Sequence, residues 1–276
     1  MSYDPLSVMR QFDTFGDEEW QRLVASPLNE VGLHIHTHYL KKHIRPGMYL
    51  LEIGAGAGRF TYVLAQLGAR LVVADLSPVQ LELNRRHTTE LGCAGAVEEW
   101  AQVDICDLAR YATGSFDAVV AYGGPLSYVL DRRAEALAEC LRVVRPGGVL
   151  LLSVMCLWGS ARRHLQGVIN GTPPEVNRRL IATGDISPAT FPGRRDNYMH
   201  LFRSAELRAW LEGAGLRLLD LSASGVLSGG WEELLAGIRS DPLKWADLLE
   251  MELEASCQPG SLDLGTHLVA AAQIPG

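Results

Sequence analysis

The sequence predicts an α/β protein with a parallel sheet, because short apolar runs alternate with helical segments from residue 49 onward. The runs read YLLEI at 49–53, RLVVA at 70–74, EEWAQV at 98–103, FDAVVAY at 116–122 and VLLLSV at 149–154. Nearly continuous apolar strands are typical of a sheet that is covered on both faces. We therefore expect helices on both faces of this sheet.

The helices between these strands are predicted from their start and stop signals. The expected ranges are 59–67, 77–91 and 132–143. Ser77 is placed to cap the second helix, and Pro78 suits its first turn. After the third helix, the RPGG sequence at 145–148 is expected to form a turn.

The chain is expected to divide into four parts around this core. In order, they are a helical cap at 1–45, the ligand-binding core at 46–155, a polar insertion rich in arginine at 156–200, and a C-terminal part at 201–276 with a helical insertion at about 224–262. The cap is predicted to hold two helices, the first capped by Asp13 or Thr14 and the second beginning at Ser26 and Pro27. The insertion at 156–200 follows a strand at the edge where open α/β sheets bind ligands, so we expect it to be a lid.

Composition excludes several classes of protein. The net charge is −7 and no basic domain is present, which argues against a nucleic-acid partner. No apolar run approaches the length of a membrane span, and the N-terminus lacks the pattern of a secretory signal. The five cysteines are scattered without a C-x-x-C pair, which favours reduced thiols in the cytoplasm over disulfides or a zinc site.

A glycine-rich loop follows the first strand, in LEIGAGAGRF at 51–60. Such a loop places backbone amides and a helix N-terminus against a ligand. It is not a Walker loop, because Arg59 and Phe60 stand where lysine and serine or threonine are required, and it lacks the third glycine of the dinucleotide fingerprint. Asp75 ends the second strand, where an acid can accept hydrogen bonds from ribose hydroxyls. The alternative for Asp75 is a cap on the following helix.

Taken together, these features resemble the class I S-adenosylmethionine-dependent methyltransferases. The stretches that carry the resemblance are LEIGAGAGRF at 51–60, VVADLSPVQL at 72–81, QVDICDL at 102–108, FDAVVAYGGPLSYV at 116–129, LRVVRPGGVLLLSV at 141–154 and HLFRSAELRAWLEGAGLRLLDL at 200–221. The resemblance implies a Rossmann-like, seven-stranded, mostly parallel sheet with helices on both faces, and S-adenosylmethionine as the cofactor. An N-terminal helical segment and two insertions would be added to this core.

The resemblance also implies which residues bind the cofactor. They are Glu52, Gly54, Ala55, Gly56, Gly58, Asp75, Leu76, Asp104, Ile105, Ala121 and Tyr122. Asp75 would hold the ribose and Leu76 would contact the adenine, while Asp104 would accept the adenine amine and Ile105 would flank the ring. Glu52 or nearby carbonyls could hold the methionine ammonium. The alternative for Glu52 is a partner for Arg59 or for a loop amide.

The methyl acceptor is expected to be a small molecule, methylated at oxygen or nitrogen. The sequence after the fourth strand departs from the N/D-P-P-Y motif of amino methyltransferases of nucleic acids, and the acids of the metal-dependent catechol type are missing, so no metal is expected. The remaining alternatives are a protein or RNA methyltransferase, a catalytically silent cofactor-binding protein and a nicotinamide-dependent oxidoreductase.

Two residues are candidates for catalysis. His200 lies where the chain rejoins the core and could act as a general base, since its ordinary pKa is near neutral. Tyr122 lies in the loop nearest the transferring methyl, where it could equally be a packing residue. The LHIHTHYLKKH stretch at 33–43 holds four histidines, which we expect to be mainly surface residues, although Tyr39 or a histidine could reach the pocket. Arg194 and Arg195 would face the acceptor from the lid.

Overall fold

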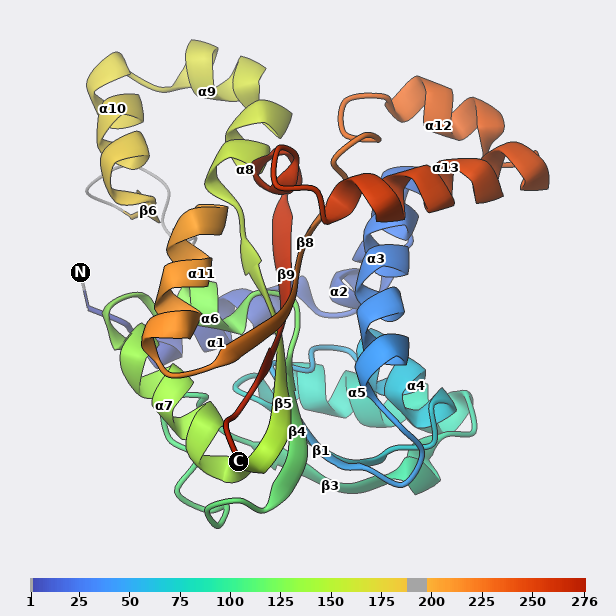
Figure 1. The fold of residues 1–276 in the computed structure, drawn as a ribbon, viewed down its shortest axis with the longest axis vertical. Coiled ribbons are helices and arrows are strands. Elements are labelled where there is room, and N and C mark those ends of the chain that lie inside the picture. The colour runs from blue at the N-terminus through green and yellow to red at the C-terminus, as the bar shows by residue number, and fades with distance from the viewer. Residues whose placement is uncertain (1, 188–197) are drawn as a thin grey trace.

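The core of the protein is a seven-stranded sheet, within the residues that the computed structural model describes, 2–187 and 198–276 (Figure 1). Its strands are β1 (Tyr49–Ile53), β2 (Arg70–Asp75), β3 (Val97–Gln102), β4 (Phe116–Ala121), β5 (Val144–Met155), β8 (Arg217–Ser224) and β9 (His267–Gln273). They lie in the order β3-β2-β1-β4-β5-β9-β8. Only β9 runs antiparallel to its neighbours, so the Rossmann-like, mostly parallel sheet expected from the sequence is confirmed.

The order of the strands fixes where ligands can bind. From β1 the chain moves outward to β2 and β3, and then returns to place β4 on the other side of β1. The loops that follow β1 and β4 therefore diverge from the carboxyl edge of two neighbouring strands. Open α/β sheets bind ligands at such a switch point.

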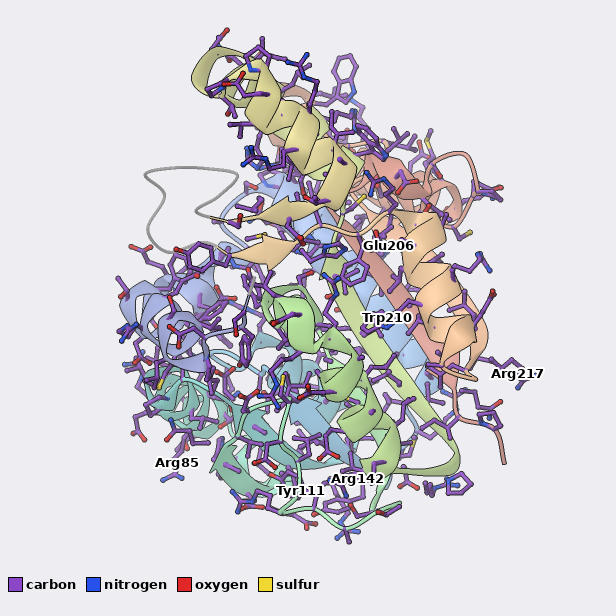
Figure 2. All side chains as sticks on the ribbon, turned by 90° about the vertical axis from the view of Figure 1, so that its left-hand side faces the viewer. Arg85, Tyr111, Arg142, Glu206, Trp210 and Arg217 are labelled. Atoms are coloured by element: carbon purple, nitrogen blue, oxygen red, sulfur yellow. The ribbon has the colours of Figure 1, made fainter. Side chains whose placement is uncertain are left out.

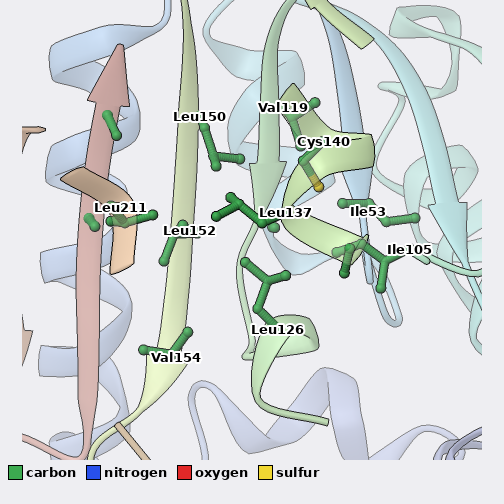
Figure 3. Close-up of a cluster of buried hydrophobic side chains, with 14 of the residues drawn as sticks. Ile53, Ile105, Val119, Leu126, Leu137, Cys140, Leu150, Leu152, Val154 and Leu211 are labelled. Atoms are coloured by element: carbon green, nitrogen blue, oxygen red, sulfur yellow. The ribbon is translucent and has the colours of Figure 1, made fainter. Parts of the chain in front are cut away.

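Helices cover both faces of this sheet (Figure 1). One face carries α7 (Arg133–Val143) and α11 (Ser204–Gly213), and the other carries α3 (Pro27–His43), α4 (Arg59–Gln66) and α5 (Pro78–Glu90). Figure 3 shows Leu137 and Cys140 of α7 packed toward Val119, Leu150 and Leu152 of the sheet. These side chains are fully or almost fully buried, so the core holds the strands, and the loops at their ends, in place.

The N-terminal cap differs from the prediction. It contains α1 (Pro5–Phe15) and α2 (Glu18–Arg22) before α3, so two helices stand where one was expected. The cap at Asp13 or Thr14 is wrong, because the Asp4 carboxylate accepts from the Leu6 amide at 3.1 Å and begins α1 at a proline. The predicted start of α3 is confirmed, since the Asn29 amide donates to the Ser26 hydroxyl at 3.3 Å.

The RPGG sequence is not a turn between a helix and a strand, as was expected. It lies inside β5, where the pairing with β4 shifts between Phe116–Val144 and Ala118–Val149. The three added residues on β5 form an irregularity that bends the strand without ending it. At Gly148 a Cβ atom would lie 2.4 Å from the side chain of Val144, so only glycine fits this bend.

The two insertions are largely helical and lie beyond the carboxyl edge of the sheet (Figure 1). The first contains α8 (Leu157–Arg163), α9 (Leu165–Gly171), α10 (Pro174–Thr183), β6 (Asp185–Ile186) and β7 (Met199–His200), and the second contains α12 (Glu232–Ile238) and α13 (Pro242–Ser256). The remaining short elements are α6 (Pro125–Tyr128) and single 3-10 turns at Ala94–Ala96, Leu130–Arg132 and Leu262–Leu264. Arg194 and Arg195 lie outside the described residues. Among those that are described, no helix is both long and apolar enough to cross a bilayer.

A buried carboxylate holds the start of the second insertion. Glu252 of α13 is fully buried, and it accepts hydrogen bonds from the backbone amides of Val226, Leu227 and Ser228. Carboxylates that accept several amides in this way form strong, charge-assisted bonds. The loop that follows β8 is therefore fastened to α13.

We expect Glu252→Ala to lower the free energy of unfolding by about 2–4 kcal/mol, because it leaves buried amides without an acceptor. Urea unfolding followed by circular dichroism measures the change. Glu254→Ala, on the exposed side of the same helix, is the control and should change stability by less than about 0.5 kcal/mol. Equal effects of the two substitutions would show that the Glu252 bonds do not contribute to stability.

Candidate active site

Two cavities meet at the carboxyl edge of the sheet. The glycine-loop cavity measures about 80 Å³ and is lined by the loop after β1, by Asp75 and Leu76 after β2, and by residues of the N-terminal cap. The histidine cavity measures about 670 Å³ and lies between α2, α3, α8 and the loop after β8. Gly123, which follows β4, lines both cavities. The loop after β4 is thus where a ligand in one cavity would face a ligand in the other.

The glycine loop requires glycine for two reasons. Its residues Gly54, Gly56 and Gly58 all have positive φ, at +69°, +55° and +100°. A Cβ atom on Gly54 would lie 3.0 Å from the side chain of Pro125, and one on Gly58 would lie equally close to that of Asn84. The loop therefore combines a left-handed backbone with close neighbours, which only glycine tolerates.

Asp75 connects the glycine loop to the end of β2. One carboxylate oxygen accepts from the Gly56 amide and the other from the Ser77 amide, both at 2.8 Å. Burial raises the pKa of Asp75 to about 6, although these two amide bonds act to lower it. The helix cap on α5 is Ser77, whose hydroxyl accepts from the Gln80 amide at 3.0 Å. Asp75 itself lines the glycine-loop cavity, as expected for a group that holds a ligand.

Glu52 lies beneath the loop and lines neither cavity. Its carboxylate accepts from the Thr61 hydroxyl at 2.7 Å, and the Asn84 amide donates both to Thr61 at 2.8 Å and to the Gly56 carbonyl at 3.2 Å. Burial raises the pKa of Glu52 to about 8, and the charge of Asp75 adds to this shift. The geometry therefore supports a structural role for Glu52. A contact with the methionine ammonium remains a prediction that this geometry does not support.

Asp104 is covered by the first residues of the chain. Its carboxylate accepts from the Tyr3 hydroxyl at 3.2 Å and from the Cys106 amide at 2.8 Å. The Tyr3 amide in turn donates to Asp131 at 2.7 Å. Tyr3 thus occupies the position at which Asp104 was expected to accept an adenine amine. Ile105 and Leu76 line the glycine-loop cavity as expected.

The Asp75 carboxylate and the apolar side chains around this cavity fit a nucleoside, but the volume of the cavity does not. Pockets for ligands of this size typically measure about 300–1,000 Å³. Side chains of the N-terminal cap occupy the missing volume, since the lining of the cavity includes Tyr3, Val8, Phe12 and Glu19. Binding of a nucleoside here requires these residues to move outward.

The other predicted cofactor residues lie behind the cavity wall. Ala121 is fully buried in β4, and Ala55 is half-buried in the loop, where its amide donates to the Ala74 carbonyl at 3.1 Å. Tyr122 turns its ring to the face covered by α3, 5.2 Å from the ring of Phe60. Its hydroxyl is buried without a hydrogen-bond partner among the described residues, and burial raises its pKa strongly. Tyr122 therefore shapes the wall, and a catalytic role for it remains a prediction.

His200 is enclosed by two carboxylates and lines neither cavity. Its Nδ1 lies 2.7 Å from Asp185, and its Nε2 lies 2.7 Å from Glu206, which Figure 2 labels on α11. Although burial acts to raise the pKa of Glu206, the bond from His200 brings it below its ordinary range. This arrangement ties β6 and β7 to α11. A catalytic role for His200 stays a prediction, and this geometry favours a structural one.

Two histidines that sequence reasoning did not select line the larger cavity. The rings of His36 and His267 lie 6.0 Å apart, and His36 also contacts the ring of Tyr122 at 5.0 Å. Burial lowers the pKa of His36 to about 4 and that of His267 to about 3. The only signal in the sequence was that His36 lies on the helix face opposite to His34 and His38. His267 gave none, because its position depends on the antiparallel direction of β9.

The histidine cavity is basic although the protein is acidic. Arg22, Arg162 and Arg163 line it, and Glu232 is the one acidic residue among its described lining residues. Arg163 pairs with Glu232 at 3.6 Å, whereas Arg162 donates to two carbonyls, those of Gly229 at 2.6 Å and Leu264 at 3.4 Å. Within the described chain, no three side chains of His, Cys, Asp or Glu are grouped so that they could hold a metal ion.

Comparison with known proteins identifies the class of chemistry. Residues 51–152 match the family described as a methyltransferase domain. A ubiquinone biosynthesis O-methyltransferase of Xanthomonas axonopodis pv. citri (strain 306) is 30% identical over 71% of this chain and 74% of its own length. The corresponding protein of Xanthomonas oryzae pv. oryzae (strain PXO99A) is 31% identical over 67% of this chain and 68% of its own.

Solved structures share the fold at lower identity. The [4+2]-cyclase SpnF has a TM-score of 0.57 and 20% identity, with 88% of this chain and 81% of that chain covered. The 1,6-didemethyltoxoflavin-N1-methyltransferase of Burkholderia thailandensis has a TM-score of 0.57 and 16% identity, with 98% and 88% covered. A chain of the complex between the Haloferax volcanii Trm112 methyltransferase activator and a methyltransferase reaches a TM-score of 0.62 at 17% identity, with 98% of both chains covered.

We predict that Asp75→Ala weakens binding of S-adenosylmethionine by about 1.5–3 kcal/mol, the usual loss for hydrogen bonds to a charged group. The substitution also releases the Gly56 amide, so the loop loses its fixed position. Isothermal titration calorimetry on the folded variant measures the change. An affinity equal to that of the unmodified protein would exclude Asp75 from the cofactor site.

A second prediction concerns the pH dependence of stability at Glu52. Its pKa is raised from about 4.3 in an unfolded chain to about 8 in the fold, so its contribution is full at low pH and is lost as the pH rises through 8. Glu52→Gln removes the ionisable group, so the free energy of unfolding of this variant relative to the unmodified protein should rise by about 4 kcal/mol between pH 5 and pH 9. Urea unfolding at several pH values measures this gain, and a pH-independent difference would contradict it. Glu254→Gln, at an exposed site, is the control.

Proposed function

The chain belongs to the S-adenosylmethionine-dependent methyltransferases that act on small molecules, and from this premise we propose that it methylates an oxygen atom of an acceptor bound in the histidine cavity. The observation that carries the proposal is Gly123, which lines both cavities. The names of the relatives, which are O-methyltransferases, support oxygen over nitrogen as the atom methylated.

S-Adenosylmethionine supplies an electrophilic methyl group on a sulfonium. The residues that would hold it are the glycine loop, Asp75 with Leu76 and Ile105, and Asp104 once Tyr3 has moved aside. The protein's own contribution is to orient the two ligands, and good orientation can supply roughly 7–11 kcal/mol of the barrier. The loop after β4 sets this orientation, because its residue Gly123 lines both cavities.

We propose that the two insertions supply the residues that bind the methyl acceptor. From the first, α8 supplies Arg162 and Arg163, and from the second, the loop at 225–231 supplies Gly229 and the start of α12 supplies Glu232. The bond from Arg162 to the Gly229 carbonyl joins them. Among the described residues, those of α9 and α10 do not line the cavity, so we restrict the proposed lid to α8. We also propose a cytoplasmic location without a nucleic-acid partner, supported by the scattered cysteines and the acidic charge.

Product analysis tests the proposal. The protein is incubated with S-adenosylmethionine and a panel of small phenols and amines, and mass spectrometry detects a gain of one methyl group. Methylated phenols are the expected products. Methylated amines without methylated phenols would show that the protein methylates nitrogen and not oxygen. Cofactor binding without any methylated product across the panel would favour a silent cofactor-binding protein.

Gly123→Ala should lower kcat by roughly 10- to 100-fold while the affinity for S-adenosylmethionine changes less than twofold. A Cβ atom at this position meets no atom within 4 Å, so the methyl group projects into open space at the junction. Alanine at Gly123 also strains the backbone, because φ there is +82°. Gly92→Ala is the matched control, since Gly92 has a φ of +69° and equally open surroundings but lines neither cavity. Similar losses of activity in both variants would assign the effect to backbone strain.

A further inference from the structure

The histidine cavity has two chemically different parts, a pair of histidines and a group of arginines. We propose that His36 accepts the proton of an acidic hydroxyl, such as a phenol, on an acceptor whose carboxylate is bound by Arg162. This inference rests on the proposed function, because it names the substrate class of the same cavity. The sequence predicts neither residue as catalytic or cofactor-binding, although the arginines of the first insertion favour a carboxylate-bearing acceptor.

The position of His36 suits a base. Its Nδ1 lies 2.7 Å from the Gly32 carbonyl, one turn earlier in α3, so this nitrogen carries the hydrogen. The lone pair is then on Nε2, for which no protein partner exists among residues 2–187 and 198–276. When Nε2 takes a proton, the Gly32 carbonyl still accepts from Nδ1 and stabilises the charged ring.

Each side of the His36 ring is defined by a different element. Tyr122 after β4 and Phe60 of α4 contact it at 5.0 and 5.5 Å. The ring centroid of His267 in β9 lies 6.0 Å from that of His36, and the charge of Arg22 acts on the ring from the cap. Burial is the largest cause of its low pKa, and Arg22 adds to it. His36 is consequently neutral at pH 7, and an anionic acceptor in the cavity would offset the charge of Arg22 and raise the pKa of the ring, which makes it a stronger base.

The charge of the cavity indicates the rest of the acceptor. Arg162 makes its bonds to carbonyls, and no carboxylate lies within ion-pair distance of it in the described chain. Arginine binds planar carboxylates through two parallel bonds, and its charge remains at every physiological pH. A cavity of about 670 Å³ holds a small aromatic acid. The site therefore fits a hydroxylated aromatic carboxylate better than a neutral or cationic molecule.

The proposed reaction is balanced. The O–H bond of the acceptor breaks and its proton passes to Nε2 of His36, while an oxygen lone pair forms the new bond to the methyl carbon. The pair of electrons of the carbon–sulfur bond stays on sulfur, which becomes a neutral thioether. His36 then releases its proton to solvent, so the products are the methyl ether, S-adenosylhomocysteine and a proton.

A binding experiment tests both parts without methyl transfer. The probe is 4-hydroxy-3-nitrobenzoate, whose phenolate absorbs visible light. With S-adenosylhomocysteine present, the unmodified protein should bind the probe and shift it toward the phenolate at a pH where the free probe is partly protonated. His36→Gln and His36→Asn should bind the probe without this shift, Asn being able to keep the bond to Gly32. His34→Gln, on the same helix but outside both cavities, should behave like the unmodified protein.

Arg162→Gln should weaken binding of the probe at least tenfold, and Arg162→Lys, which keeps the charge, should weaken it less. Binding of 2-nitrophenol, which lacks the carboxylate, should not change in either variant. Retained affinity for S-adenosylhomocysteine shows that each variant is folded. Equal binding of 4-hydroxy-3-nitrobenzoate by the unmodified protein and Arg162→Gln, absence of binding, or a phenolate shift that survives in both His36 variants would overturn the inference.

Turnover gives a second measurement that separates a base from a packing residue. With 4-hydroxybenzoate, His36→Gln should lower kcat by about 10²–10⁴-fold at pH 7. With the nitro derivative, which ionises without help, the loss should fall below tenfold. If the probe binds and ionises as expected but neither compound is methylated, the proposed function fails for this acceptor while the proton-accepting site stands. Equal losses on both compounds would contradict the role of His36 as a base.

Discussion

The hydrogen bond from the Gly56 amide to Asp75 connects the two loops on which the site depends. It joins the turn after β1 to the end of β2, where the two strands leave the sheet. The turn itself has a left-handed backbone at alternate residues, which glycine permits but does not enforce. The conformation is held by hydrogen bonds on either side of Gly56. Its amide donates to Asp75, and its carbonyl accepts from Asn84, which belongs to the buried group with Glu52 and Thr61. The backbone of the glycine loop is therefore fixed before any ligand arrives, and only the cap has to move outward for a nucleoside to enter.

Much of the core could be predicted because local signals and the overall fold agree there. The β1 strand has the bounds that its apolar run indicates, and α5 begins at Ser77 and Pro78 as expected. The prediction was wrong where two local signals competed. Pro5 preceded by Asp4 begins a helix earlier than Asp13, and the RPGG sequence bends a strand instead of ending it.

The acceptor side could not be predicted from the sequence for a different reason. Whether His36 is buried depends on which face of α3 meets the sheet, and the position of His267 depends on the direction of β9. His200 looked more promising by its place in the chain, but the carboxylates of Asp185 and Glu206 enclose it. These are consequences of tertiary contacts between distant segments. Short sequence patterns carry no information on them.

The contact of Tyr3 with Asp104 has a kinetic consequence. Residues 3–19 close over the place where the sequence predicts the adenine, through a hydroxyl, a backbone amide and apolar side chains. A spent nucleoside can leave only after these contacts break, so its residence time is set by an opening of the protein as well as by affinity. In an enzyme that binds its cofactor at this place, the opening of the segment that holds Tyr3 is therefore a step of the catalytic cycle.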